Sequence, residues 1–258
     1  MSVNMIAITI CYQCRVEELR LSLHHVTIQE MEEQPEHKLI VIEGTDGSGK
    51  KTQTAKLHEY LKSQGKEVRV MSFPNYDSPS SALVKSYLSG ELGLSADCLD
   101  PYQASILFAA DRVCTMKQVH SKLDKPTTII LDRYTQSNMT HQAGKIKDTE
   151  ELDKFLDWLD HFEFETLKLP RVDKVIFLDV PPDVSFKLSN ERGQLKIGEA
   201  FTQDIHEADL QHIADTYNAA KHVAEKYNWN VIQCTDDSGE LKTVDEIHEL
   251  VKAIVDIS

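Results

Sequence analysis

The chain has 258 residues, of which 41% are hydrophobic, and its formal net charge at pH 7 is −14. This length suits one α/β domain, or one domain with an appendage. The negative charge and the lack of a Lys/Arg-rich tract argue against a nucleic acid-binding protein. No apolar run approaches the roughly 20 residues that cross a bilayer, and the cysteines do not form the pattern of a disulfide framework. We therefore expect a cytoplasmic protein that binds neither nucleic acid nor membrane.

Residues 1–37 precede the first strand of the expected core. The stretch 30–36 is acidic and contains Pro35, which is typical of a linker. Cys11 and Cys14 form a C-x-x-C pair, but no second pair completes a four-ligand zinc site, so coincidence is favoured over a metal or redox site. We predict that residues 1–37 are an N-terminal extension outside the core, with a partner-binding arm as the alternative, and that residues 38–258 form the folded domain.

From residue 38 onward, short apolar runs alternate with helical stretches. Runs rich in Val, Ile, Leu or Phe predict strands buried on both faces of a parallel sheet, over Leu39–Glu43, Glu67–Phe73, Thr127–Asp132, Lys174–Asp179 and Asn230–Cys234. Helices are predicted over 50–64, 79–91, 101–123, 135–143, 149–166, 182–191, 203–227 and 242–256. The alternation predicts a three-layer α/β fold, in which a five-stranded parallel sheet is flanked by helices and binds ligands at the carboxyl ends of its strands.

The run Ile40–Thr52, IVIEGTDGSGKKT, combines a strand, a glycine-rich loop and the start of a helix. The pattern G-x-x-x-x-G-K is complete from Gly44 to Lys50 and predicts a phosphate-binding P-loop. Backbone N–H groups, the helix dipole and the lysine charge together attract nucleotide phosphates. The next position normally holds Ser or Thr, but here it is Lys51, so the hydroxyl expected to contact Mg²⁺ is missing. The predicted nucleotide-binding residues are Gly44, Thr45, Asp46, Gly47, Ser48, Gly49, Lys50, Lys51 and Thr52.

Asp132 and Arg133 end the predicted strand 127–132. In a P-loop fold, an aspartate at this place can hold Mg²⁺ through water, and an arginine can clamp a phosphate with its planar guanidinium. A structural ion pair closing the strand end is the alternative. Beside a P-loop we favour the functional interpretation, with Asp132 as the metal residue.

Phe108 and Arg112 are four residues apart on the predicted helix 101–123 and therefore share a face. A ring and a guanidinium on one face can sandwich a base or bind its edge. On spacing alone, however, the favoured interpretation is a core phenylalanine and a surface ion pair of Arg112 with Asp111 or another acid.

Several motifs, in this order along the chain, resemble those of the thymidylate kinase family: EGTDGSGKKTQ, SFPNYDSP, LFAADR, LDRYTQSNMTHQAG, LDVPPDV and NERG. The resemblance runs from about Lys38 to the C-terminus. It implies a P-loop NTPase fold with a short lid at about 190–203. It also implies transfer of the γ-phosphoryl group of ATP to dTMP in dTTP biosynthesis, with Mg²⁺ as cofactor, and a homodimer.

The resemblance also implies roles for single residues. Lys50 and the loop N–H groups would hold the ATP phosphates, with Thr52 adding a hydroxyl. Arg133 would bind the acceptor phosphate, and Arg192 of the lid would close over the transferring group, with Lys196 as a second candidate. The implied catalytic residues are Lys50, Arg133, Arg192 and Asp46.

For the acceptor, the resemblance implies that Phe108 stacks on thymine and that Arg112 reads the base edge. Asp46 would contact the region of the sugar 3′-hydroxyl and the phosphate. The implied dTMP-binding residues are Asp46, Phe73, Phe108, Arg112, Arg133, Ser137 and Gln142.

Three residues depart from the pattern of many relatives. Lys51 replaces the hydroxyl residue, Tyr76 stands where many have an arginine, and His141 stands where many have a tyrosine. Tyr76 and His141 leave open a kinase for another deoxynucleoside monophosphate. Lys51 leaves open a nucleotide-binding homologue with weak catalysis.

Overall fold

The computed structural model describes residues 37–93, 95–195 and 210–256. The chain divides into two units, Met1–Glu36 and His37–Ser258, and only the second is described below. Cys11 and Cys14, Lys196 and positions 196–203 of the predicted lid lie outside the described residues. The assignment of residues 1–37 as an extension stays a prediction.

The described strands form one five-stranded sheet in the order β2-β3-β1-β4-β5, and all neighbouring strands are parallel. Their bounds are β1 Lys38–Glu43, β2 Val68–Ser72, β3 Thr128–Asp132, β4 Lys174–Asp179 and β5 Asn230–Gln233. The predicted parallel α/β sheet is therefore confirmed, with every strand end within about a residue of its expected position. Because β1 lies at the centre, between β3 and β4, the loop that follows it is surrounded by other strand ends.

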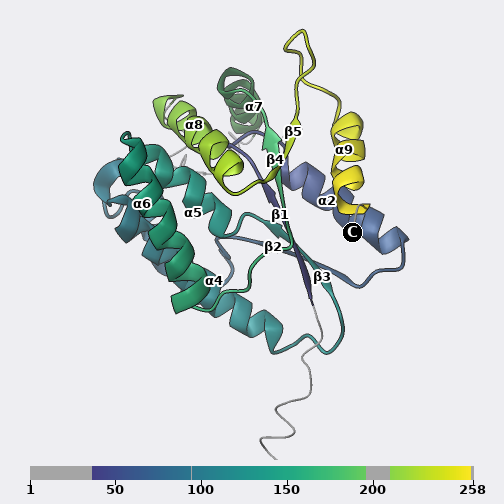
Figure 1. The fold of residues 1–258 in the computed structure, drawn as a ribbon, viewed down its shortest axis with the longest axis horizontal. Helices are drawn as coiled ribbons and strands as arrows, with labels where there is room; N and C mark the ends of the chain where they lie inside the picture. The colour runs from purple at the N-terminus through teal and green to yellow at the C-terminus, as the bar shows by residue number, and fades with distance from the viewer. Residues whose placement is uncertain (1–36, 94, 196–209, 257–258) are drawn as a thin grey trace, which may run out of the picture. The chain divides into compact units, whose positions relative to one another are not determined.

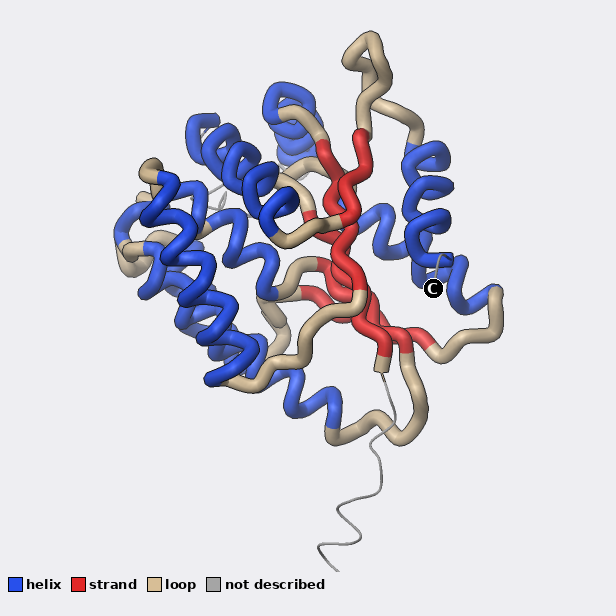
Figure 2. The backbone as a smooth tube through the Cα atoms, in the orientation of Figure 1, coloured by secondary structure: helices blue, strands red, loops and turns tan. Residues whose placement is uncertain are grey.

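Helices cover both faces of the sheet, as Figures 1 and 2 show. One face is covered by α2 (Lys50–Ser63) and α9 (Val244–Asp256). The other is covered by α4, α5, α6 and α8, which span Pro101–His120, Thr135–His141, Thr149–Asp160 and Leu210–Lys226. Successive side chains of a strand point to opposite faces, so Ile40 and Ile42 of β1 join one buried cluster and Leu39 and Val41 the other.

Several predicted helices differ from the structure in extent: those predicted over 101–123 and 135–143 end earlier, at His120 and His141, and three others differ as follows. The predicted helix 79–91 is a 3-10 turn, Pro79–Ser81, followed by α3 (Ala82–Leu88). The predicted helix 182–191 extends further, as α7 (Pro182–Leu195). The predicted helix 149–166 is wrong in its last turn, because α6 ends at Asp160 and residues 161–166 form a wider π-helical turn, here called η4.

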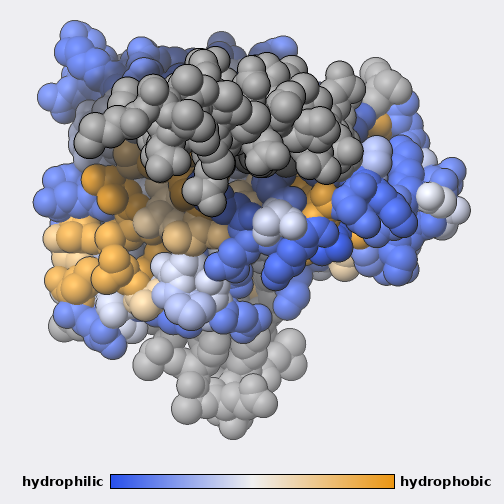
Figure 3. Space-filling model, turned by 90° about the horizontal axis from the view of Figure 1, so that it is seen from below, coloured by the Kyte–Doolittle hydropathy of each residue, from blue (hydrophilic) through white to orange (hydrophobic). Residues whose placement is uncertain are grey.

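Apolar side chains are also exposed on the helical face opposite α2 and α9. Leu83 of α3 and Tyr102 and Ile106 of α4 keep 58%, 40% and 47% of their surface exposed. Figure 3 shows apolar surface, in orange, gathered on the side where α4 lies in Figure 1. None of the helices in the described part of the chain is both long and apolar enough to span a membrane.

Candidate active site

The pairing of β1 with β3 brings two predicted site segments together. Ile42 of β1 lies opposite Asp132 of β3. The loop after β1 and the residues that end β3 therefore leave the sheet side by side, at its carboxyl edge. This is the edge at which open parallel sheets bind their ligands.

The loop between β1 and α2 has the backbone that a phosphate cradle needs. Gly47 has φ 91°, and a Cβ there would lie 2.2 Å from the Ser185 carbonyl oxygen. Gly49 caps the N-terminus of α2 with φ 88°, and no side chain caps this end. The first N–H groups of the helix thus remain available to an anion.

Lys50 folds over its own loop. Its Nζ donates hydrogen bonds to the carbonyl oxygens of Gly44 (2.6 Å) and Thr45 (2.8 Å) and lies 3.7 Å from an Asp46 carboxylate oxygen. Burial and the nearby charge of Arg133 lower the pKa of Lys50, and the carboxylate of Asp46 offsets this only in part. Lys51 and Thr52 follow on the exposed side of the first turn of α2.

An ion pair between Asp46 and Arg133 joins the phosphate loop to the end of β3. Burial raises the pKa of Asp46, but the charges of Arg133 and Lys50 outweigh it and hold that pKa well below its usual range. Arg133 Nη1 lies 2.8 Å from His141 Nε2. Since a guanidinium only donates, this histidine nitrogen accepts the bond and carries no proton.

The backbone of Arg133 is unusual. Its φ is 70°, a left-handed conformation that costs a non-glycine residue about 1–2 kcal/mol. Strained backbone of this kind is concentrated at binding and catalytic sites. The sharp turn starts directly after the last residue of β3 and accompanies the pairing of this side chain with the phosphate loop.

Beside this ion pair lies a cavity of about 690 Å³, part of which is open to solvent. Every residue that the sequence predicted to bind the acceptor lines it, together with Tyr76 and His141. Its predicted lining residues are Asp46, Phe73, Phe108, Arg112, Arg133, Ser137 and Gln142. The structure thus brings these scattered positions around one space next to the phosphate loop.

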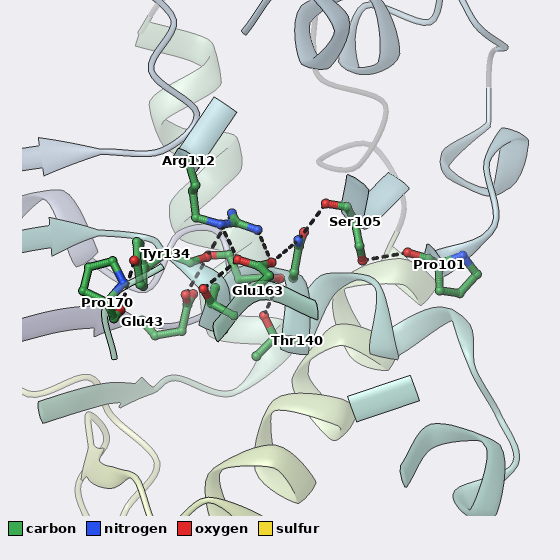
Figure 4. A network of polar contacts seen from close by, with 11 residues as sticks. Glu43, Pro101, Ser105, Arg112, Tyr134, Thr140, Glu163 and Pro170 are labelled. Carbon is green, nitrogen blue, oxygen red and sulfur yellow. Dashed lines mark hydrogen bonds and ion pairs between the residues drawn. The ribbon is translucent and has the colours of Figure 1, made fainter. Parts of the chain in front are cut away.

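Arg112 does not form the surface ion pair that its spacing favoured. It is 2% exposed, and its Nε and Nη2 donate to the carboxylate of buried Glu163 at 2.8 and 2.5 Å (Figure 4). Asp111 instead accepts bonds from the Asn75 backbone N–H and the Ser80 hydroxyl. Phe108 is half-buried and lines the cavity, so it is not a purely internal core residue either.

Ser137 and Gln142 differ in what they can offer a ligand. The Ser137 hydroxyl donates to Glu43 Oε2 (2.6 Å), and Glu43 Oε1 accepts the Gly44 N–H (3.0 Å). The Gln142 side-chain oxygen, by contrast, is buried without a hydrogen-bond partner in the described structure. Ser137 therefore links the cavity to the phosphate loop, whereas Gln142 carries a free acceptor.

Comparison with known proteins identifies the family. A model of the thymidylate kinase family matches residues 42–244. The chain belongs to the thymidylate kinase family. It is 32% identical to the thymidylate kinase of Mycobacterium tuberculosis over 67% of this chain and 80% of that protein. It is 28% identical to the Plasmodium falciparum thymidylate kinase over 85% and 90% of the two chains.

The fold matches as well. A solved thymidylate kinase from Candida albicans superposes with a TM-score of 0.62 over 86% of this chain and 92% of that one, at 23% identity. The predicted P-loop NTPase fold is therefore confirmed, and a protein of the thymidylate kinase family carries out ATP-dependent phosphoryl transfer.

Two site residues of this thymidylate kinase-family chain, Glu43 and Glu163, are not among those predicted from its sequence. Glu43 is the acid that ends β1, and its position directly before the P-loop was the available signal. Glu163 lies inside a segment predicted as an ordinary helix, 51 residues from Arg112, and no local pattern marked it. Arg192, a predicted lid residue, falls on α7, and its role stays a prediction.

The strain at Arg133 yields a test. Arg133→Gly and Arg133→Ala both remove the guanidinium, but only glycine adopts φ 70° without steric cost. We expect the glycine variant to be more stable than the alanine variant by about 1 kcal/mol, measured as the difference in unfolding free energy in urea. Equal stability, or a more stable alanine variant, would contradict the assigned strain.

Proposed function

We propose that the protein transfers the γ-phosphoryl group of ATP to dTMP, forming ADP and dTDP. The observation that carries the proposal is the Asp46–Arg133 ion pair, which lies where the phosphate loop meets the cavity. A nucleotide held by the loop presents its terminal phosphate next to this cavity. Donor and acceptor are thereby placed beside each other, which is the main requirement of phosphoryl transfer.

The donor half rests on the loop and Lys50. The uncapped start of α2 offers N–H groups to the ATP phosphates. The Lys50 ammonium, now bonded to the Gly44 and Thr45 carbonyl oxygens, would turn to the phosphate oxygens. Phosphate binding would raise its lowered pKa again, since an anion favours the charged form.

The acceptor half rests on Arg133, Phe108 and Gln142. The Arg133 guanidinium suits a phosphate, which would compete for it with Asp46. Phe108 offers a ring for stacking on the base. The unpaired oxygen of Gln142 suits the N3–H of thymine. Cytosine has no hydrogen on N3, so this oxygen favours thymine or uracil over cytosine.

The chemistry needs no covalent intermediate, because the acceptor phosphate is already an anionic nucleophile. Catalysis then consists of alignment and of neutralising the charge on the transferring group. Lys50 and Arg133 supply positive charge from the donor and acceptor sides. We assign Arg192 to the lid side, with Lys196 as the second candidate, and expect lid closure to exclude water.

Mg²⁺ is the cofactor implied by the family, and the carboxylate of Asp132 fits it. This half-buried aspartate ends β3 beside the phosphate loop, and Mg²⁺ prefers carboxylate, phosphate and water oxygens. The described residues contain no group of three or more His, Cys, Asp or Glu side chains that could hold a metal. Asp132 would therefore hold the ion mainly together with nucleotide phosphates and water, and the ion would neutralise phosphate charge.

The substrate assignment is tested by measuring ADP release with ATP, Mg²⁺ and each deoxynucleoside monophosphate in turn. We expect dTMP to give the highest kcat/KM. A higher kcat/KM with another monophosphate would show that dTMP is not the preferred acceptor. ATP binding without ADP release would show a nucleotide-binding protein rather than a kinase.

In the same assay Lys50→Ala should lose turnover. Phe108→Ala should raise the KM for dTMP about tenfold because it removes a stacking ring, whereas Gln118→Ala on the same helix should not.

We also propose a homodimer that packs through the exposed apolar side chains Leu83, Tyr102 and Ile106 of α3 and α4. A charge introduced there would be desolvated in such an interface. In sedimentation velocity we expect the wild type and Leu250→Asp, a control at an exposed leucine of α9, to be dimers and Ile106→Asp to be a monomer. A monomeric wild type, or a dimeric Ile106→Asp variant, would contradict this interface.

A further inference from the structure

Glu163 is a buried carboxylate for which the proposed reaction has no direct use. It lies in η4, it is fully buried, and it does not line the acceptor cavity. The Leu167 N–H bonds the Phe162 carbonyl oxygen, which gives η4 the wide spacing of a π-helical turn. Such turns occur frequently at functional sites.

The two oxygens of Glu163 accept four hydrogen bonds (Figure 4). Oε1 accepts from Arg112 Nη2 (2.5 Å) and from Asn138 Nδ2 (2.9 Å). Oε2 accepts from Arg112 Nε (2.8 Å) and from the Thr135 hydroxyl (2.7 Å). An ionised carboxylate has about four acceptor positions, so Glu163 is saturated by protein groups. Its role must therefore pass through these partners.

The first partner, Arg112, lines the cavity. Binding through both Nε and Nη2 fixes the plane of its guanidinium, and Nη1 donates to the Tyr134 carbonyl oxygen at 3.3 Å. A guanidinium has five N–H donors, so two are not used by the described residues and can serve a ligand. Glu163 neutralises the positive charge of Arg112. Arg112 can therefore donate hydrogen bonds of fixed direction to a base, which is uncharged, without presenting a net positive charge to it.

The other partners, Thr135 and Asn138, lie on α5. The same short helix carries Ser137 and His141, which line the cavity, while Arg112 lies on α4. The Asn138 amide also donates to the Ser105 carbonyl oxygen of α4 (3.2 Å). Glu163 thus connects α4 and α5, which form two walls of the cavity, although Glu163 itself does not line the cavity.

We propose that Glu163 is a positioning residue for the acceptor base: it orients Arg112 and holds α5 against α4, so that the cavity fits a pyrimidine. This proposal rests on the proposed function, because it assigns the cavity to the monophosphate. It predicts that weakening the Glu163 contacts impairs acceptor binding selectively and leaves ATP binding at the phosphate loop unchanged.

The test begins with Thr135, whose hydroxyl bonds Glu163 and which does not line the cavity. Thr135→Val keeps the shape and removes the hydroxyl. We expect the KM for dTMP to rise about three- to tenfold, less than for a lost charge-assisted bond to the ligand itself, because the effect passes through Arg112 and α5. The kcat and the KM for ATP should stay within about twofold. Thr135→Ser keeps the hydroxyl and should restore the KM. Thr140→Val is the matched control, because among the described residues the Thr140 hydroxyl bonds the Ser137 carbonyl oxygen and not Glu163.

Glu163→Gln is a stronger change than Thr135→Val. The amide has one acceptor oxygen, whereas the donors of Arg112, Thr135 and Asn138 now share two carboxylate oxygens. We expect a larger rise in the KM for dTMP than with Thr135→Val, and a smaller preference for dTMP over dCMP. If this variant does not fold, the Thr135 pair decides.

Two results with Thr135→Val would overturn the proposal: an equal rise in the KM for dTMP and the KM for ATP, or a lower melting temperature with an unchanged KM for dTMP. In either case the Arg112–Glu163 ion pair would have a purely structural role. A wild type that binds dTMP without turning it over would instead count against the proposed function, and direct titration of dTMP binding to the same variants would still decide the role of Glu163.

Discussion

The site depends on one contact between two loops, the ion pair of Asp46 with Arg133. It is available only because β1 and β3 are neighbours whose ends leave the sheet together. The left-handed backbone of Arg133 accompanies this pairing, and the two charges shift each other's pKa in opposite directions. Lys50 and Arg133 already have oxygen partners, namely the Gly44 and Thr45 carbonyl oxygens and the Asp46 carboxylate. A phosphate that enters the site therefore has to displace Asp46 from Arg133, or the Gly44 and Thr45 carbonyl oxygens from Lys50.

Two buried glutamates connect the rest of the site to this contact. Glu43 bonds both the first N–H of the phosphate loop and the Ser137 hydroxyl of α5. Glu163 bonds α5 and Arg112 of α4. These two carboxylates thus link the walls of the cavity to each other and to the phosphate loop. Such pre-organisation reduces the ordering cost of binding and keeps the two substrates aligned.

The sequence predicted the features that follow from local pattern. The β-branched runs predicted every strand, and G-x-x-x-x-G-K predicted the loop after β1, because both depend on neighbouring residues. It did not predict the partner of Arg112, since Glu163 is distant in the chain and the nearby Asp111 was a plausible alternative. A 3.6-residue period also cannot separate the π-helical turn from the α-helix before it. The pairing of Arg112 with Glu163 and the backbone strain at Arg133 leave no pattern in the neighbouring sequence, and both shape the cavity.

The central claim is that the phosphate loop and the acceptor cavity form one continuous site around Asp46 and Arg133. Its most direct test is the affinity of one molecule in which adenosine and thymidine are joined through their 5′-oxygens by a polyphosphate chain, measured by titration calorimetry. We expect one molecule bound per chain, with an affinity about a hundredfold or more above that of ATP or dTMP alone, because the second half binds intramolecularly. An affinity no greater than that of the tighter single nucleotide would contradict it.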